Sequence, residues 1–227
     1  MFLSLILYIL LSEIIFSFAE HQTHRYFMHK KVLPEWIYRK YPSIFKDVFE
    51  GHAIRHHGIW YRQFDFEPHP EGREDNIKFR PVEIITALIL FLPIDFLFLN
   101  ISPLATVTFV VMLLIHAYTW NTIHSQMHLP KKVFFADWGI FRWLAIHHYL
   151  HHQLTNKNYN IVFPLADYIL GTKIKPRKRD LRELLRLGYL KPRTIRTEMR
   201  LKKLRSQIAL QRETVLIPDS EPILKSY

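Results

Sequence analysis

Long runs of apolar residues alternate with polar, histidine-bearing segments along the chain. The first run extends from Phe2 to Ala19 and, as a helix, would be about 27 Å long, close to the hydrocarbon thickness of a bilayer. No Lys or Arg precedes it, which favours a membrane span over a cleaved signal peptide, although Ser17-Phe18-Ala19 fits the small-residue pattern of a cleavage site. We therefore expect the first membrane-spanning helix at residues 2–19.

The second apolar run, from Val82 to Trp120, is too long for one helix and suits a hairpin of two. Asn100, Ser102 and Pro103 mark the turn, so the two arms would cover residues 82–99 and 104–120. The alternative is a helical hairpin buried in a soluble protein, but the length of both arms favours the membrane. The pattern therefore predicts an all-α protein, an integral membrane helical bundle that crosses the bilayer several times.

The segments between these runs are polar or mixed. Residues 30–81 predict short water-facing helices and one irregular loop at about 64–80. Residues 133–146 are amphipathic and predict a helix at the level of the lipid headgroups, where aromatic side chains are favoured. The aromatic residues that suit this position are Trp138, Phe141 and Trp143.

The C-terminal part of the chain has a different composition. From Lys173 onward, Lys and Arg far outnumber Asp and Glu, as in a tail that associates with an anionic leaflet. A solvated charged helix over residues 180–211 is the alternative. We expect a membrane-embedded domain at residues 1–172 and a basic C-terminal tail at residues 173–227.

The composition excludes several kinds of chemistry. The 227-residue chain has no cysteine, so it can form no disulfide or iron–sulfur cluster, and any metal must be held by His or carboxylate. No Gly-rich phosphate-binding motif is present. The formal net charge of +11 suits nucleic acid or an anionic membrane face, and the apolar runs favour the membrane. No nucleic-acid recognition motif is present, so we expect no nucleic-acid partner. Basic residues follow the first and third spans, which predicts that these segments face the cytoplasm.

Fourteen histidines are the unusual feature of the composition, and most lie in four short clusters. The clusters are His21, His24 and His29; His52, His56 and His57; His124 and His128; and His147, His148, His151 and His152. Spacings of three and four residues within a cluster place imidazoles on one helical face, where they can hold one metal ion. His52 with His56 and His124 with His128 have this spacing. His148, His151 and His152 share it too. His24 and His29 are five apart, so a helix between them must end or widen before both can bind one ion.

The predicted topology provides a second indication of a metal site. An even number of spans separates every pair of clusters, so all four lie on the same side of the membrane and can meet. This convergence predicts metal binding, with His21 and His147 as candidates for orienting a ligand from outside the site. Of the histidines outside the clusters, we expect His69 to be solvated and His116 to have a polar role in the core.

The histidine motifs follow a recognisable order. They are His-Arg-x-x-Met-His at 24–29, His-x-x-x-His-His at 52–57, His-x-x-x-His at 124–128 and His-x-x-His-His at 148–152. Over about residues 20–172 this set resembles the fatty acid hydroxylase superfamily, which includes lipid hydroxylases, sterol desaturases and carotenoid hydroxylases. The segment NYNIVFPLADYILGT resembles the closing element of that family and adds Asn158 and Asp167 to the candidates for orienting the site. Asn160, Ala166 and Leu170 depart from the usual Gly, Trp and Phe, which bears on the substrate more than on the metal.

The resemblance implies a non-haem di-iron centre with O₂ as co-substrate. The implied ligands are His24, His29, His52, His56, His57, His124, His128, His148, His151 and His152. It also implies a cytosol-facing site over the membrane, with a lipid substrate whose chain enters from the bilayer.

These expectations define an O₂-dependent oxidoreductase that hydroxylates a fatty acyl chain, sterol or related lipid. A desaturase on the same scaffold is the nearest alternative, and a non-catalytic metal-binding membrane protein is the alternative from another class. The electrons would come from a separate donor, a reductase with a ferredoxin or a b-type cytochrome, because the chain has no motif for a redox cofactor. We expect the protein in a bacterial inner membrane or the endoplasmic reticulum. Because ligation requires unprotonated imidazole, we also expect metal loss below about pH 6.

Overall fold

The computed structural model describes residues 2–61, 64, 78–128 and 133–214, with side chains described as far as residue 207. Contacts divide the chain into two units, Met1–Lys175 and Pro176–Tyr227. Every regular element among the described residues is helical, which confirms the predicted all-α class. The irregular loop expected at 64–80 and His69 within it lie largely outside the described residues.

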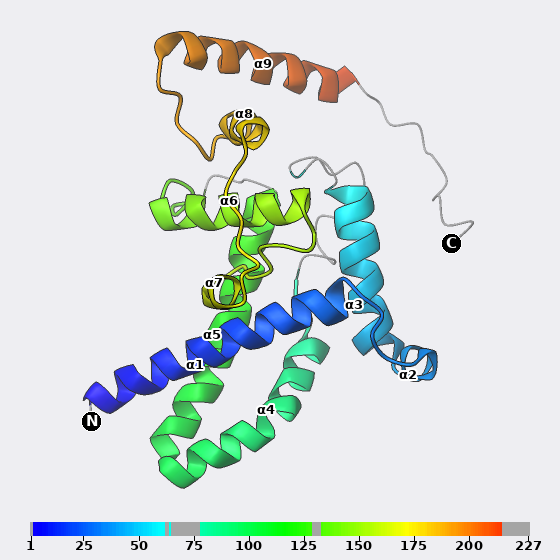
Figure 1. The fold of residues 1–227 in the computed structure, drawn as a ribbon, viewed down its shortest axis with the longest axis vertical. Coiled ribbons are helices and arrows are strands. Elements are labelled where there is room, and N and C mark those ends of the chain that lie inside the picture. The colour runs from blue at the N-terminus through cyan, green and yellow to red at the C-terminus, as the bar shows by residue number, and fades with distance from the viewer. Residues whose placement is uncertain (1, 62–63, 65–77, 129–132, 215–227) are drawn as a thin grey trace. The chain divides into compact units, whose positions relative to one another are not determined.

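Three long helices dominate the first unit. They are α1 (Phe2–Thr23), α4 (Pro81–Ile101) and α5 (Pro103–His128). Each includes a predicted span and continues past it, and each is long and apolar enough to cross a membrane. Helices α4 and α5 form the predicted hairpin, and α1 crosses α5 and packs against it (Figure 1).

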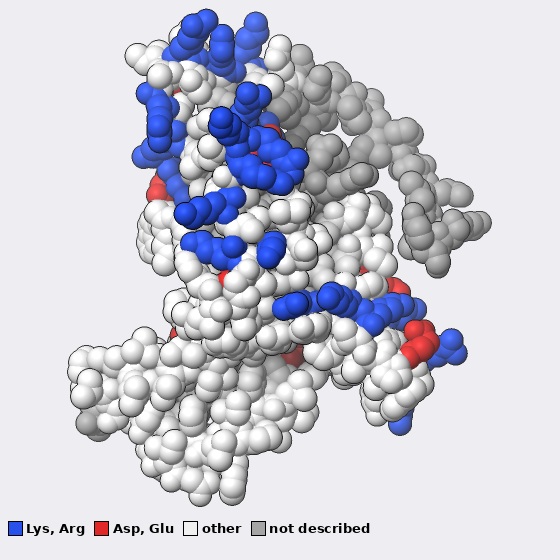
Figure 2. All heavy atoms as spheres, viewed as in Figure 1, with Lys and Arg blue, Asp and Glu red and all other residues white. Residues whose placement is uncertain are grey.

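A small aromatic core joins these three helices. Phe16 of α1 lies 4.8 Å from Phe109 of α5, measured between ring centroids, and Phe98 of α4 packs on the same ring at 5.2 Å. All three side chains are buried. Only 6% of the most apolar 18-residue stretch of α4 is buried, so most of that helix presents apolar side chains outward. On the face shown in Figure 2, the N-terminal part of α1 and the tip of the α4–α5 hairpin carry no charged side chains.

A polar contact inside the helical core involves the third candidate span. His116 of α5 places Nδ1 3.2 Å from Oε2 of Glu13 and Nε2 3.6 Å from Oε2 of Glu20, both on α1. Glu20 in turn accepts a hydrogen bond from the backbone N–H of Ile161 at 2.6 Å. His116 therefore has the polar core role expected from the sequence, because it links α5 to α1.

Short helices and π-helical segments fill the region between α1 and α4. They are η1 (His24–Met28), α2 (Glu35–Lys40), η2 (Pro42–Lys46), α3 (Asp47–Phe49) and η3 (Glu50–Trp60). The sequence predicts short helices here. The five-residue spacing of His24 and His29 allows for a wider turn in the first histidine cluster, but the π-helical turn of the second cluster is not predicted.

The helix predicted at residues 133–146 is wrong in its extent. Residues 134–137 form a turn, and helix α6 (Gly139–Gln153) begins after it. Phe141 is buried, because α6 turns Phe141, Leu144 and Ala145 toward the interior. The aromatic side chains are therefore divided between the core and the surface, and α6 carries the fourth histidine cluster as a packed helix. The short helix α7 (Leu165–Ile169) follows it.

The second unit contains two basic helices, α8 (Lys178–Leu187) and α9 (Ile195–Thr214). The single charged helix considered over residues 180–211 is interrupted at Gly188, which adopts a left-handed conformation with φ of 89°. Such a glycine is a common helix terminator because it has no Cβ to clash. Arg205 of α9 donates to the backbone carbonyls of Leu185 and Arg186 at the end of α8, which joins the two helices.

Candidate metal centre

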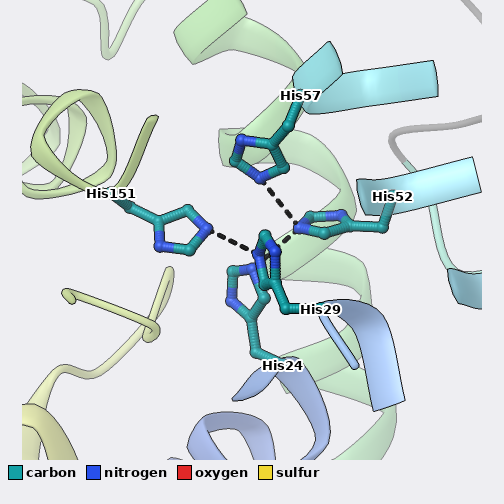
Figure 3. A group of neighbouring side chains, drawn as sticks. All are labelled: His24, His29, His52, His57 and His151. Atoms are coloured by element: carbon teal, nitrogen blue, oxygen red, sulfur yellow. Dashed lines mark hydrogen bonds between the residues drawn. The ribbon is translucent and has the colours of Figure 1, made fainter. Parts of the chain in front are cut away.

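Five imidazoles converge in a first group, drawn in Figure 3. Their nitrogens lie within 4.8 Å of one another, and they come from three segments far apart in the sequence. The members are His24, His29, His52, His57 and His151. In Figure 3 the rings point inward from η1 and the residue that follows it, from η3 and from α6. We call this set the first imidazole group.

A second group lies beside the first. His56, His128, His148 and His152 also place nitrogens within 4.8 Å of one another. His124 adjoins them, because its Nε2 lies 2.9 Å from Nε2 of His148. We call these five residues the second imidazole group. The two groups are in contact, since the ring centroids of His57 and His152 lie 4.0 Å apart.

The ten histidines that the resemblance implies as ligands thus all belong to one of two adjacent groups. Their division differs from the one that helical spacing suggests. His52 and His56 were expected to share a metal ion, but His52 belongs to the first group with His57, and His56 belongs to the second. His151 likewise belongs to the first group, whereas His148 and His152 belong to the second.

The π-helical turns explain part of this division. A π-helix forms i→i+5 hydrogen bonds, so residues five apart come close on its surface, as residues four apart do on an α-helix. Segment η1 begins at His24 and lets His29 lie on the same side, with the two rings stacked 5.1 Å apart. Segment η3 does the same for His52 and His57, whose Nε2 atoms are 3.1 Å apart. The widening that the spacing of His24 and His29 requires is therefore present.

Contacts between the imidazole nitrogens are too numerous to be hydrogen bonds. Nε2 of His148 lies 2.9 Å from Nε2 of His124, 2.8 Å from that of His128 and 3.2 Å from that of His152. A single ring nitrogen of neutral histidine either donates one hydrogen or offers one lone pair. It cannot serve three such partners. In contrast, metal–nitrogen bonds of about 2.1 Å at right angles bring two ligand nitrogens to about 3 Å from each other.

Backbone carbonyls determine which nitrogen of several rings carries the hydrogen and which carries the lone pair. A carbonyl can only accept, so Nδ1 of His24 must donate to the carbonyl of Tyr159, and Nδ1 of His151 to that of Lys157 at 2.7 Å. In the second group, Nδ1 of His128 donates to the carbonyl of Phe64 at 2.7 Å. Each neutral ring then has its lone pair on Nε2, which is the nitrogen that faces the group. This arrangement is the one by which proteins orient histidine ligands.

His56 gives a further indication of a metal site. Its side chain is buried, and neither ring nitrogen has a hydrogen-bond partner among the described residues. Leaving a buried polar nitrogen unpaired costs about 1–3 kcal/mol. A metal ion would satisfy one of these nitrogens, so the donor set fits a metal on geometry and on polar satisfaction.

Burial also holds the rings in the neutral form. It lowers the pKa of His29 to about 2 and that of His151 to about 4. Burial, followed by repulsion between neighbouring imidazolium charges, lowers the pKa well below the ordinary value for His52, His56, His57, His148 and His152. Neutral imidazole is the form that binds transition metals, so the site needs little deprotonation before a metal can enter.

The four residues expected to orient the site meet around Asp167 rather than around an imidazole group. Nε2 of His147 lies 2.9 Å from Oδ2 of Asp167, and Nε2 of His21 lies 2.9 Å from Oγ1 of Thr172 and 3.6 Å from Oδ1 of Asp167. Asn158 donates from Nδ2 to the carbonyl of His147 at 3.0 Å. These residues therefore contact no imidazole nitrogen of either group directly.

Asp167 fixes the loop that supplies the carbonyl acceptors. It accepts hydrogen bonds from the backbone N–H groups of Tyr159 at 2.9 Å and Asn160 at 2.8 Å. Burial raises the pKa of Asp167, but hydrogen bonds from His147, Thr172 and the loop outweigh this effect, so the pKa lies below its ordinary value. The ionised carboxylate holds Tyr159 where its carbonyl meets His24. Sequence reasoning missed these carbonyls, because any residue type supplies one.

We predict that Asp167→Ala lowers metal affinity by about 10–100-fold, the range seen when groups that orient ligands are removed. The physical reason is that the loop at 158–161 loses two backbone hydrogen bonds and no longer fixes the imidazole of His24. Competition with a zinc chelator would measure the affinity. Asp137→Asn, at an exposed aspartate, is the control. Equal affinities in Asp167→Ala and the unaltered protein would contradict this role.

No family model, no curated protein and no solved structure matches the chain.

Proposed function

We propose that this protein is an integral membrane oxidoreductase that holds two iron ions and uses O₂ and external electrons to hydroxylate a lipid. The observation that carries the proposal is the pair of adjacent groups built only of imidazole, at the ends of helices apolar enough to cross a membrane. Imidazole suits iron, zinc, copper and nickel, so the choice of iron comes from the resemblance of the histidine motifs to the fatty acid hydroxylase superfamily.

The arrangement of the helices supports a membrane position for the site. His24 follows the C-terminal end of α1, and His124 and His128 lie in the last turns of α5. The N-terminus of α4 is held on the same side, because Phe79 and Asn121 exchange hydrogen bonds of 2.6 and 3.1 Å. Three spans with these ends together would place both imidazole groups at one face of the bilayer. Basic residues after the first and third spans assign that face to the cytosol.

An apolar cavity leads from the helices to the first imidazole group. It has a volume of about 210 Å³, and its walls include Phe16 and Leu113 from the core, Leu90 on the exposed side of α4, and His24. A hydrocarbon chain entering between α1 and α4 would reach His24 through a cavity whose walls are mostly apolar. The cavity therefore supports a lipid as the substrate.

The groups that form this site have three tasks in the proposed reaction. The Nε2 lone pairs bind the metal, the backbone carbonyls orient the rings, and the apolar cavity holds the chain and excludes water. Bound iron would supply the redox chemistry that breaking an unactivated C–H bond requires. The balanced reaction is RH + O₂ + 2e⁻ + 2H⁺ → ROH + H₂O. The two electrons would come from a separate reductase, with a ferredoxin or a b-type cytochrome as carrier.

Lipid profiling of cells that express the protein tests this function. We expect a lipid whose mass rises by that of one oxygen atom, appearing only with O₂ and absent when His148→Ala is expressed to the same level. A loss of two hydrogens would instead identify a desaturase on the same scaffold. Bound metal in the purified protein, with neither product nor O₂ consumption in the presence of a reductant, would identify a metal-binding protein without catalysis and overturn the proposal.

A further inference from the structure

A polar cavity adjoins the apolar one and has no part in the function proposed so far. Its volume is about 270 Å³, and its walls include His52, the cations Arg55, Lys78 and Arg80, and the carboxylates Asp47 and Glu83. Both carboxylates lie within ion-pair distance of Arg80. The two cavities share part of their lining, including Met28 and Trp120. The space beside the first imidazole group therefore has an apolar arm and a polar arm.

The cations of the polar cavity differ in how they are engaged. Arg80 is occupied, because Nε donates to Glu83 at 2.8 Å and Nη2 donates to the carbonyl of Ser43 at 2.8 Å. Arg55 and Lys78 form no ion pair with any residue that the structure describes. Nε of Arg55 is buried and has no hydrogen-bond partner there. A buried guanidinium N–H without an acceptor can donate a hydrogen bond to an anion.

The first imidazole group borders both arms. His24 lines the apolar cavity and His52 lines the polar one, and their Nε2 atoms are 2.8 Å apart. A molecule that occupied both arms would thus pass beside the metal position at the point where its polar end joins its chain.

We propose that the two cavities bind one anionic, single-chain amphiphile. Arg55 and Lys78 bind its carboxylate or phosphate head, and the apolar cavity binds its chain. As a statement about the substrate this rests on the proposed function, and it places oxidation on the carbons nearest the head. An anionic head is favoured over a neutral one because Arg55 and Lys78 are cations without anionic partners among the described residues. A chain is favoured over a free anion because the two cavities are adjacent and share lining residues.

Binding to zinc-loaded protein in a neutral detergent tests this inference separately from catalysis, because zinc has no redox chemistry. The probes are palmitate, hexadecyl phosphate and the neutral hexadecanol, which share a chain length, together with inorganic phosphate. We expect both anionic amphiphiles to bind about tenfold or more tightly than hexadecanol, since a charge-assisted hydrogen bond contributes more than a neutral one. Inorganic phosphate should bind far more weakly than hexadecyl phosphate.

Two variants assign the preference to the polar cavity. Arg55→Gln and Lys78→Gln should each bring the affinity for palmitate toward that for hexadecanol and leave hexadecanol unchanged. Lys78 lies outside η3, so it tests the inference even if Arg55→Gln disturbs the neighbouring ligand His56 and loses zinc. Arg39→Gln with Lys40→Gln removes two positive charges from α2 and should change nothing.

The measurements separate failure of this inference from failure of the proposed function. Equal binding of palmitate and hexadecanol, or an anion preference that survives both substitutions, would overturn the inference and leave a hydroxylase of neutral lipids possible. Equal affinity for inorganic and hexadecyl phosphate would show a free-anion site and also overturn it. Anion-selective binding that depends on Arg55 and Lys78 would sustain it whether or not the iron-loaded protein turns over.

Discussion

Replacing His148 by alanine is expected to remove the metal ion of the second imidazole group and to reduce lipid oxidation to background. Nε2 of His148 contacts three other imidazole nitrogens of that group, so its loss removes the ligand nearest to all the others. The first group keeps its five rings, and we expect the metal content to fall from about two ions per chain to about one. Metal analysis of the purified protein measures the content, and product formation measures activity.

His151→Ala is the complementary variant, because His151 lies on the same helix but belongs to the first group. It should lose the other ion and also lose activity, since the proposed reaction needs both. Ile140→Ala is the matched control on α6, because the side chain of Ile140 is exposed and Ile140 belongs to neither group. It should keep about two ions, the number set by the two groups. Two retained ions and continued turnover in His148→Ala would contradict the assignment of the ligands.

The sequence predicts the helices that carry the site better than the division of the site itself. Apolar length alone locates α1, α4 and α5, because a bilayer-spanning helix needs a long uninterrupted run of apolar side chains. The four histidine clusters are likewise identified by residue type and spacing, and the resemblance of their motifs implies the ten ligands within them. Their assignment to two groups depends on the wider turns of η1 and η3, and no residue type at those positions predicts a π-helix.

The groups that orient the ligands were only partly predictable. Asp167 and Asn158 are found from the resemblance of the closing segment, and both are buried close to the site. Their mode of action is not in the sequence, because they act through backbone atoms. Asn158 adopts a φ of 53°, which asparagine tolerates better than most residues, and its side chain links His147 to Ile174. The loop that it shapes then presents the carbonyls of Lys157 and Tyr159 to ring nitrogens.

Acidification is expected to destabilise the metal-free protein steeply, because most of its histidines are buried in the neutral form. In the unfolded chain each imidazole binds a proton below about pH 6.5, whereas in the folded chain burial lowers the pKa to about 2 for His29 and about 4 for His151. The unfolded state therefore takes up more protons as the pH falls through 6.5, and stability falls with it. Above pH 7.5 both states are neutral and this effect is absent.

The size of the effect follows from the number of buried rings. Each histidine with a strongly lowered pKa costs about 1 kcal/mol of folding free energy at pH 6, and the cost grows by about 1.4 kcal/mol per further pH unit at lower pH. Several such rings together approach the whole stability of a typical domain. Urea unfolding followed by tryptophan fluorescence should therefore show nearly constant stability from pH 8 to 7.5 and a steep fall between pH 6.5 and 5.

The same linkage explains why metal retention and folding should fail together in acid. A bound ion needs the lone pairs on Nε2, so it adds to the free energy of protonating the rings and moves the fall in stability to lower pH. Metal content and fluorescence should then change over one common pH range in the zinc-loaded protein. His57→Phe, which removes one buried imidazole, should make the acid dependence of the metal-free protein shallower by about one proton. A stability that stays constant from pH 8 to 5 would mean that the rings are protonated in the folded state, which would contradict the neutral imidazole groups on which the metal site depends.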